Sequence, residues 1–226
     1  MIQFLQNSWL ALLLSAVVSY LFGSISFAVI VTRLLKKRDI RDFGSGNAGA
    51  TNVLRSQGVV PALLTTIGDL GKSAAAVTFS GWAFKTLQFA PPEGALPENL
   101  ALIGCYIGGF CCMFGHLYPI FFGFRGGKGV MSTAGMMLLL DWRATLLLLA
   151  IFIVILLCSR MVSLGSITVA ALLAPVTYVF RTLLYHQEPS TVWFCTIVVG
   201  LMGIIIIVKH GSNIKRILNH TESKMW

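Results

Sequence analysis

Uninterrupted apolar runs, close to the length of a transmembrane helix, recur from one end of the chain to the other. A helix needs about 20 mostly apolar residues to cross the hydrocarbon core of a bilayer. Charge is scarce, since only 11% of the residues are charged, whereas a soluble domain carries roughly 25%. The runs are continuously apolar rather than alternating, so they do not fit a transmembrane β-barrel. The sequence therefore predicts an all-α polytopic membrane protein.

The runs predict seven transmembrane helices within a single membrane domain covering residues 1–226, with no soluble domain or linker. A proline-rich segment from Lys85 to Glu98 is expected to form an external loop. The predicted spans are Trp9 to Leu35, Val59 to Phe84, one beginning at Asn99, one ending at Leu140, Ala144 to Cys158, one opened by Arg160 to Ser166 and ending at Leu184, and Thr191 to Val208.

The basic residues predict how these helices are oriented. The net charge is +9, and in a membrane protein such an excess gathers in cytoplasmic loops. All but four of the 17 Lys and Arg residues fall on one side when the spans alternate, the exceptions being Lys72, Lys85, Arg143 and Arg181. This bias predicts an external N-terminus and a cytoplasmic C-terminus. The charge is explained by topology, so no nucleic-acid partner is expected.

One predicted cytoplasmic loop, from Phe43 to Arg55, is unusually rich in glycine, amides and hydroxyls. Its spacing matches the G-x-G-x-x-G dinucleotide motif, but that motif requires a preceding strand, and here the basic end of a span precedes it. Small residues leave backbone N–H groups uncovered, and nearby cations favour an anion such as phosphate. We interpret the loop as an anion-binding cradle.

A second glycine-rich stretch, Gly126-Gly-Lys-Gly129, follows the third span and is predicted to be cytoplasmic. It resembles a Walker A loop, but its spacing is one residue short, and glycine stands where a magnesium-binding Ser or Thr is needed. An anion cradle with Lys128 as a point charge fits the residues better. His116, just upstream, is a candidate for acid–base chemistry or phosphate contact.

Two further polar stretches belong to the same predicted side. The third contains Ser163 and Ser166, which share a helical face, and the fourth contains His210 and Asn213, also one turn apart. His210 is a second candidate for acid–base chemistry. Neither His116 nor His210 has an Asp five residues later, so the His-x4-Asp pattern of coenzyme-A-dependent acyltransferases is missing.

Some residues inside the predicted spans are also informative. Asp69 and Lys72 lie three apart on one helix face, and such residues usually face a polar cavity or each other; a structural ion pair and a direct catalytic role are equally supported. Small residues of the third span predict close helix packing. The five cysteines occur in apolar segments without zinc spacing, which predicts buried packing.

Taken together, these motifs resemble a known family, the bacterial acyl-phosphate:glycerol-3-phosphate acyltransferases, which are small inner-membrane enzymes with seven spans. The resemblance covers essentially the whole chain, in the right order. The motifs that carry it are Gly44-Ser-Gly-Asn-Ala-Gly-Ala-Thr-Asn-Val-Leu-Arg55, Gly115-His-Leu-Tyr-Pro-Ile-Phe-Phe-Gly-Phe-Arg-Gly-Gly-Lys-Gly-Val130, Val162-Ser-Leu-Gly-Ser-Ile167 and His210-Gly-Ser-Asn-Ile-Lys-Arg216.

The resemblance implies acyl transfer from acyl-phosphate to the 1-hydroxyl of glycerol 3-phosphate, giving lysophosphatidic acid and phosphate in the first step of phospholipid synthesis. The site would lie on the cytoplasmic side of the bacterial inner membrane. Catalytic roles are implied for Ser45, Arg55, Lys128, His210 and Asn213. Substrate-binding roles are expected for Gly44, Gly46, Asn47, Thr51, Asn52, His116, Gly126, Gly127, Gly129 and Ser166.

The chemistry of such a reaction agrees with the residues. An acyl-phosphate carries a good leaving group, so no covalent nucleophile is required, and the site needs only to bind two phosphates and align a hydroxyl. No cofactor or metal is expected, because no carboxylate cluster falls on the predicted cytoplasmic side. The expected partners are the two substrates, the lipid bilayer and a functional link to the enzyme that supplies acyl-phosphate.

Two other functions compete with this one. A transporter of a phosphorylated solute could use glycine-rich broken helices to bind an anion, but the polar stretches gather on one side and no repeat of interrupted spans is visible. A structural membrane scaffold would leave the glycine-rich stretches unexplained.

Overall fold

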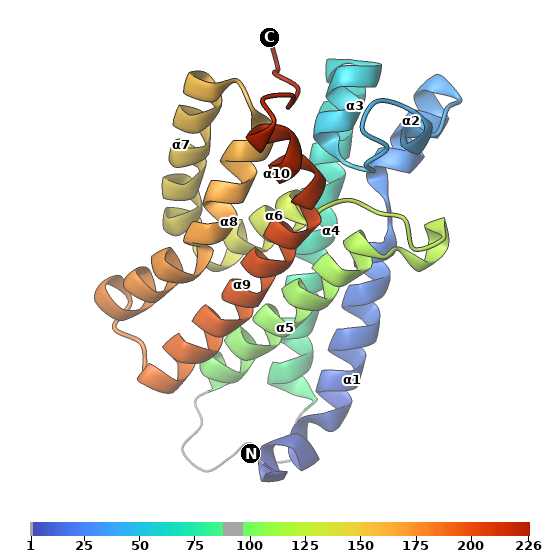
Figure 1. The fold of residues 1–226 in the computed structure, drawn as a ribbon. Coiled ribbons are helices and arrows are strands. Elements are labelled where there is room, and N and C mark those ends of the chain that lie inside the picture. Colours follow the sequence, from blue (N-terminus) through green and yellow to red (C-terminus); the bar gives the residue numbers. More distant parts are fainter. Residues whose placement is uncertain (1, 88–96) are drawn as a thin grey trace. The chain divides into compact units, whose positions relative to one another are not determined.

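The computed structural model describes residues 2–87 and 97–226, and every regular element within these ranges is helical. The predicted all-α fold is therefore confirmed. The principal helices (Figure 1) are α1 (Ile2–Ser24), α2 (Phe27–Lys36), α3 (Ala50–Gln57), α4 (Val59–Thr86), α5 (Pro97–Leu117), α6 (Val130–Leu140), α7 (Trp142–Ser159), α8 (Val162–Val179), α9 (Pro189–Lys209) and α10 (Gly211–Leu218). Three short helical segments, Ile40–Asp42, Ile120–Phe122 and Phe180–Leu184, complete the set.

Within the described residues, five helical stretches are long and apolar enough to cross a membrane: Ser8–Lys36, Asn99–Phe122, Trp142–Ser159, Val162–Leu184 and Pro189–Lys209. The other two predicted spans differ from these. Helix α4 has 28 residues but includes an Asp, a Lys and several hydroxyls, whereas α6 is apolar but has only 11 residues. Most of the predicted external loop, residues 88–96, lies outside the described residues.

The chain forms two compact units, Met1–Leu140 and Asp141–Trp226. In the first unit, α5 packs closely against its neighbours through small residues. Any side chain at Gly104 or Gly108 would collide with α4, and one at Gly115 would collide with the backbone of α1. Ser19 and Ser80 add a 2.9 Å hydrogen bond between α1 and α4. The predicted close packing of the third span is confirmed, as expected where small residues let helices approach.

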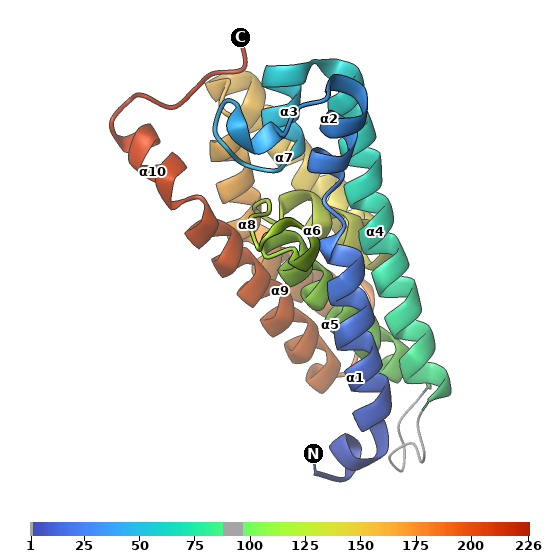
Figure 2. The same ribbon diagram turned by 90° about the vertical axis from the view of Figure 1, so that its right-hand side faces the viewer.

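The first predicted span is not one continuous helix. It breaks at Ile25 and Ser26, where α1 ends and α2 begins (Figure 2), and Ser26 has an extended backbone conformation. Beyond α2, the predicted loop from Phe43 to Arg55 is a loop only in its first half, because Ala50–Gln57 forms α3.

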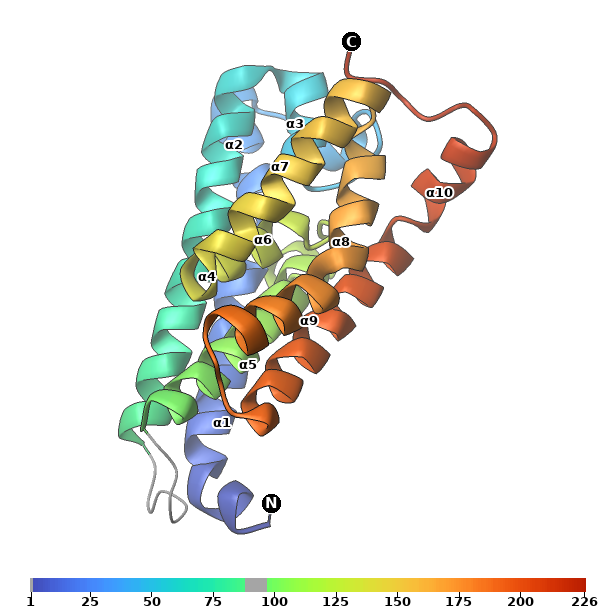
Figure 3. The same cartoon turned by 90° about the vertical axis from the view of Figure 1, so that its left-hand side faces the viewer.

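The second unit contains α7 to α10 (Figure 3). Its α8 and α9 touch at Gly203, where a side chain would collide with the Ala170 carbonyl. The chain after α10 returns to the start of α8, and the Met225 N–H donates to the Arg160 carbonyl at 2.8 Å. The C-terminal tail is therefore attached to the connection between α7 and α8 by a backbone hydrogen bond.

The cysteine prediction is partly wrong. Cys112 and Cys195 are buried and two others are half-buried, but Cys158 is exposed. The reason is that α7 buries only Ala144 and Leu148 along its length. Cysteine behaves as a small hydrophobic residue, so an outward-facing apolar helix accommodates it without a packing partner.

Candidate active site

Each of the four polar stretches leads into the beginning of a helix. The first precedes α3, the second precedes α6, the third opens α8, and the fourth opens α10. The first N–H groups of a helix have no partner within the helix, and the helix dipole favours negative charge at that end. Such ends are natural binding sites for phosphate. The local folding of these stretches therefore agrees with their interpretation as anion cradles.

The first stretch is folded around Asn52, a buried residue of α3. Its amide nitrogen donates to the carbonyls of Ile40, Phe43 and Asn47 at 2.9–3.2 Å. Its oxygen accepts from the Ser45 N–H at 3.1 Å. The Asn52 side chain thus holds the loop from within, a structural role that we did not predict; its contact with substrate stays a prediction.

Backbone shape explains two of the glycines in this stretch. Gly44 and Gly46 have φ values of +57° and +68°, which only glycine adopts at low cost. A side chain at Gly44 would also collide with the Asn52 oxygen. Between these glycines Ser45 is exposed, so the turn presents its hydroxyl outward. Arg55, one turn after Asn52 on α3, is exposed as well.

The second stretch packs directly on His116 and on the first stretch. The Gly127 N–H donates to the His116 carbonyl at 3.1 Å. A side chain at Gly127 would collide with the His116 ring and with the Ala48 carbonyl. The two glycine-rich stretches are therefore in contact, and Lys128, half-buried, follows at the entrance to α6.

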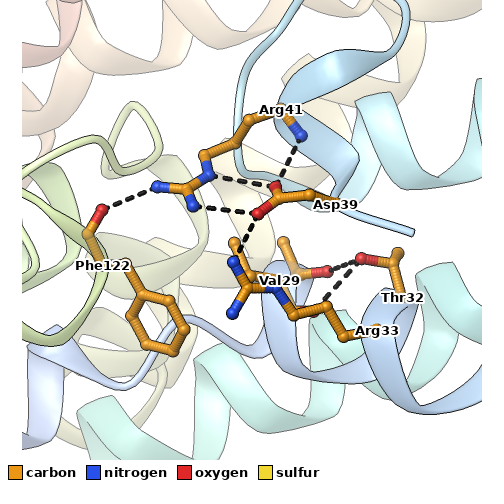
Figure 4. Close-up of polar contacts among 7 residues, drawn as sticks. Val29, Thr32, Arg33, Asp39, Arg41 and Phe122 are labelled. Atoms are coloured by element: carbon orange, nitrogen blue, oxygen red, sulfur yellow. Dashed lines mark hydrogen bonds and ion pairs between the residues drawn. The ribbon is translucent and has the colours of Figure 1, made fainter. Parts of the chain in front are cut away.

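An ion-pair cluster also joins the segments that precede the two stretches (Figure 4). Asp39 pairs with Arg33 at 2.7 Å and with Arg41 at 2.9 Å. Arg41 also donates to the Phe122 carbonyl at 2.6 Å. The hydrogen bond from Arg41 is the largest influence on Asp39 and holds the pKa of its carboxyl well below the ordinary range. Arg41, assigned by us only to topology, ties the segment before the first stretch to the segment before the second.

A buried polar cluster lies behind the second stretch. Lys72 and Asp69 form an ion pair at 2.8 Å, with both side chains 1% exposed. Lys72 also lies 2.9 Å from His116 Nδ1 and donates to the Ile25 carbonyl at 2.8 Å. The ion-pair alternative for Asp69 and Lys72 is therefore what the structure contains.

In the second unit, Asn213 and Ser163 both donate to Glu222 Oε1 at 2.7 Å. Arg216 pairs with the other oxygen of Glu222 at 2.7 Å. Burial opposes ionisation of Glu222, but these hydrogen bonds outweigh burial and lower the pKa of its carboxyl. The tail thereby fixes the Asn213 amide, a role for Glu222 that we did not predict.

His210 lies at the junction between α9 and α10, so it does not share one continuous helix with Asn213 as we predicted. Its Nδ1 lies 2.8 Å from the Ile206 carbonyl. A carbonyl only accepts, so Nδ1 carries the proton and the lone pair of the neutral ring is on Nε2. Ser166, on α8, is buried and donates to the Val162 carbonyl at 2.9 Å.

The structure thus brings the predicted residues together as two separate groups. The first unit joins the two glycine-rich stretches, with Gly44, Ser45, Gly46, Asn47, Thr51, Asn52, Arg55, His116, Gly126, Gly127, Lys128 and Gly129. The second unit holds Ser166, His210 and Asn213. That all of these serve one reaction stays a prediction. Among the described residues, no cluster of His, Cys, Asp or Glu is arranged to hold a metal ion.

Three residues with clear roles were missed: Asp39, Arg41 and Glu222. The signal for the first two was the short Asp-x-Arg spacing, which lets one guanidinium fold back on the carboxylate. Glu222 had a weaker signal, namely an acidic residue after a basic helix.

Comparison with known proteins identifies the family. The model of the glycerol-3-phosphate acyltransferase family matches residues 13–220. The chain belongs to this family. It is 40% identical over 209 residues to the glycerol-3-phosphate acyltransferase of Syntrophomonas wolfei, covering 92% of this chain and 94% of that protein. The acyltransferase of Jannaschia sp. is 37% identical over 225 residues, covering 100% and 98% of the two chains.

Solved structures of another glycerol-3-phosphate acyltransferase, the integral membrane protein PlsY (YgiH), are also similar. Its glycerol 3-phosphate form has a TM-score of 0.76 and 30% identity, covering 95% of this chain and 96% of that one. Its lysophosphatidic acid form has a TM-score of 0.73 and 29% identity, covering 95% of each chain. This chain is accordingly a multi-pass membrane acyltransferase of phospholipid biosynthesis.

Proposed function

We propose that this acyltransferase moves a fatty acyl group from acyl-phosphate to the 1-hydroxyl of glycerol 3-phosphate. Lysophosphatidic acid and phosphate would be the products, in the first step of phospholipid synthesis. The acceptor is supported by the names of the curated relatives. The product is supported by the solved relative, which has both a glycerol 3-phosphate form and a lysophosphatidic acid form.

The observation that carries the proposal is the contact between the two glycine-rich stretches of the first unit. Gly127 packs on the Ala48 carbonyl, so the residues that open α3 and those that open α6 belong to one compact region. Arg55 and Lys128 come from these same two segments. Two helix N-termini with two cations suit a reaction between two phosphate-bearing substrates.

The acyl-phosphate donor is proposed from the resemblance of the sequence motifs, and the chemistry of the site is compatible with it. Acyl-phosphate is a mixed anhydride, so the hydroxyl of glycerol 3-phosphate can attack the acyl carbon directly. The C–O bond to phosphate then breaks, and phosphate leaves with its bonding electrons. In this mechanism Ser45, Arg55 and Lys128 bind phosphate, and glycine N–H groups stabilise the negative charge that develops in the transition state. The enzyme supplies alignment and charge rather than a nucleophile.

The hydroxyl proton has two acceptors in this scheme. One is Nε2 of His210, whose lone pair is set by the Nδ1 hydrogen bond to Ile206. The other is the phosphate of the substrate itself. We assign Asn213 and Ser166 to substrate binding in the same reaction. A His210→Ala variant distinguishes the two acceptors, because only a general-base role predicts a kcat loss of roughly 100-fold or more.

The topology proposed with this function has seven spans, an external N-terminus and a cytoplasmic C-terminus. Five helices long and apolar enough to cross a membrane support the multi-span part of this topology, and the 28 residues of α4 reach about 42 Å at 1.5 Å per residue. Residues 1–226 would act as one membrane domain in the bacterial inner membrane. The site would face the cytoplasm, which supplies glycerol 3-phosphate and the enzyme that makes acyl-phosphate. No cofactor is part of the proposal.

The direct test uses purified protein with palmitoyl-phosphate and glycerol 3-phosphate. Phosphate should be released without coenzyme A, and lysophosphatidic acid should form in equal amount. Absence of both products across several acyl chain lengths would reject the donor assignment. Uptake of labelled glycerol 3-phosphate into proteoliposomes, without product, would instead support a transporter.

The phosphate-binding roles are tested by Arg55→Ala and Lys128→Ala. Each should reduce turnover by about 100-fold or more, because each removes a cation from the developing charge. Lys36→Ala is the matched control, since it removes an exposed cation of α2 outside both glycine-rich stretches. Rates close to wild type in the first two variants would contradict their assigned roles.

A further inference from the structure

The ammonium group of Lys72 contacts three acceptor atoms, which come from α4 itself, from the break between α1 and α2, and from α5. Asp69 Oδ1 lies 2.8 Å away on the same helix. The Ile25 carbonyl lies 2.8 Å away, and His116 Nδ1 lies 2.9 Å away. An ammonium has three N–H donors and no acceptor; here two of its contacts are hydrogen bonds and the third is the ion pair with Asp69. A charge this deeply buried needs such complete pairing.

The first acceptor outside α4 comes from the break between α1 and α2. At this break the Ile25 carbonyl receives its hydrogen bond from Lys72 rather than from a following helical turn. Phe27, which opens α2, packs against Gly68 so closely that a side chain there would collide with the Phe27 ring. Lys72 and Gly68 together fix where the broken helix passes α4.

The second acceptor, His116, carries the influence of Lys72 to the glycine-rich stretches. Because an ammonium only donates, Nδ1 of His116 accepts, and the proton of the neutral ring is on Nε2. The Nε2 side of the ring is the side that faces Gly127. Lys72 therefore sets both the orientation and the tautomer of the ring on which Gly127 rests.

The position of this ring determines where the second stretch lies. Gly127 is confined between the His116 ring and the Ala48 carbonyl, and its N–H is bonded to the His116 carbonyl at 3.1 Å. A displaced ring would move Gly127 and, with it, the neighbouring Lys128. A continuous series of contacts thus runs from Asp69 through Lys72 and His116 to the cradle.

We propose that Lys72 is a positioning residue of the substrate site: with Asp69 as its counter-ion, it fixes the ring of His116, which in turn holds Gly127 and Lys128. The proposal rests on the proposed function, in which Lys128 binds phosphate. Lys72 and Asp69 themselves touch no substrate in this scheme. They act through the geometry of the second stretch.

The first test is the double variant Asp69→Asn/Lys72→Met, which removes both charges together so that no buried charge is left unpaired. We expect it to fold but to lose about 100-fold in kcat/KM, the effect of misplacing a binding group by about 1 Å. Lys85→Met is the matched control, because it makes the same substitution at an exposed position of the same helix. Wild-type kcat/KM in the folded double variant would overturn the proposal.

The second test does not depend on turnover. Hydrogen exchange of the amides in residues 43–50 and 118–130 should be roughly 10-fold faster in the double variant, as local opening becomes easier, and unchanged in Lys85→Met. Unchanged exchange at those amides would overturn the proposal. If wild-type protein makes no product, the proposed function fails, while this comparison still decides whether Lys72 positions the stretches.

A pair of substitutions at His116 separates positioning from simple packing. His116→Gln keeps an oxygen that can accept from Lys72, whereas His116→Leu fills similar space without an acceptor. We expect the Gln variant to keep most of the wild-type amide protection. It should also be at least 10-fold more active than the Leu variant. Equal behaviour of the two variants would contradict a role for the Lys72 hydrogen bond.

Discussion

Two carboxylates of the first unit bind cations in opposite surroundings. Asp39 is partly exposed and pairs with both Arg33 and Arg41. Asp69 is 1% exposed and forms its ion pair with Lys72, with His116 Nδ1 3.6 Å away, while neither of its oxygens has a hydrogen-bond partner among the described residues. The Asp39 carboxylate thus has two cationic partners and some access to water. The Asp69 carboxylate has one cationic partner and almost no access to water.

This difference shows that the two ion pairs do different work. In the Asp39 cluster Arg33 is exposed, while Asp39 and Arg41 are partly buried but keep some access to water, and ion pairs that water can replace contribute little stability. The Asp69 charge has no such alternative, because Lys72 would otherwise be a lone cation inside the helix bundle. Loss of one member of the buried pair should therefore destabilise the fold, because the other charge is left unpaired, whereas the partly exposed Asp39 cluster acts mainly on the geometry of the loops.

The largest expected effect is on the buried side of this comparison. Asp69→Asn alone leaves Lys72 charged and uncompensated, so it should destabilise the protein by about 3–5 kcal/mol. Thermal unfolding in detergent measures this loss. The double variant Asp69→Asn/Lys72→Met should be more stable than Asp69→Asn. If the single variant is as stable as wild type, the contrast between the two carboxylates is wrong.

A smaller effect on stability is expected at the partly exposed Asp39 cluster. Arg41→Met should cost only about 1 kcal/mol, because Asp39 keeps Arg33 and access to water. Turnover should fall further than stability does, by about 10-fold, since the bond to the Phe122 carbonyl also aligns the segment that leads into the second stretch. Steady-state kinetics and unfolding of the same preparation test this, with Lys36→Met as control. A loss of stability as large as that of Asp69→Asn would contradict the comparison.

The smallest effect is a pH dependence. The pKa of Asp39 is lowered in the folded protein, chiefly by the Arg41 hydrogen bond. Its contribution to stability is therefore complete above the ordinary aspartate pKa of 3.8 and declines as the pH falls below that value, where only the unfolded chain takes up the proton. Melting temperatures measured from about pH 7 to about pH 3 should fall less steeply for Asp39→Asn than for wild type. Parallel curves would remove Asp39 from the acid response.

The sequence was sufficient for the helical class and for the polar stretches, because apolar periodicity and glycine content are local properties. It also located Asp69 and Lys72 on one helix face, which the 2.8 Å pair confirms. The break at Ile25 could not be foreseen, since Ser24 and Ser26 occur within an apolar run and serine is tolerated in membrane helices. The group that satisfies the Ile25 carbonyl at the break is the ammonium of Lys72, which lies 47 residues later in the sequence.

Other structural roles were not foreseen because one residue can satisfy two interpretations at once. Asn52 looks like a substrate ligand in a polar loop, yet its amide closes the loop on itself. Arg41 looks like one more cytoplasmic cation, yet it reaches a carbonyl 81 residues away. Non-local hydrogen bonds decide such cases, and nothing in the local pattern records them.

The break at Ile25 also has a consequence for biogenesis. A bare carbonyl within hydrocarbon costs several kcal/mol, and the donor that satisfies this one is not yet synthesised when the first span emerges. The stretch Ser8–Lys36 should consequently be unstable in the bilayer on its own. The Ile25 carbonyl gains its hydrogen bond only when α4 supplies Lys72. We therefore expect the translocon to release these two segments into the bilayer together.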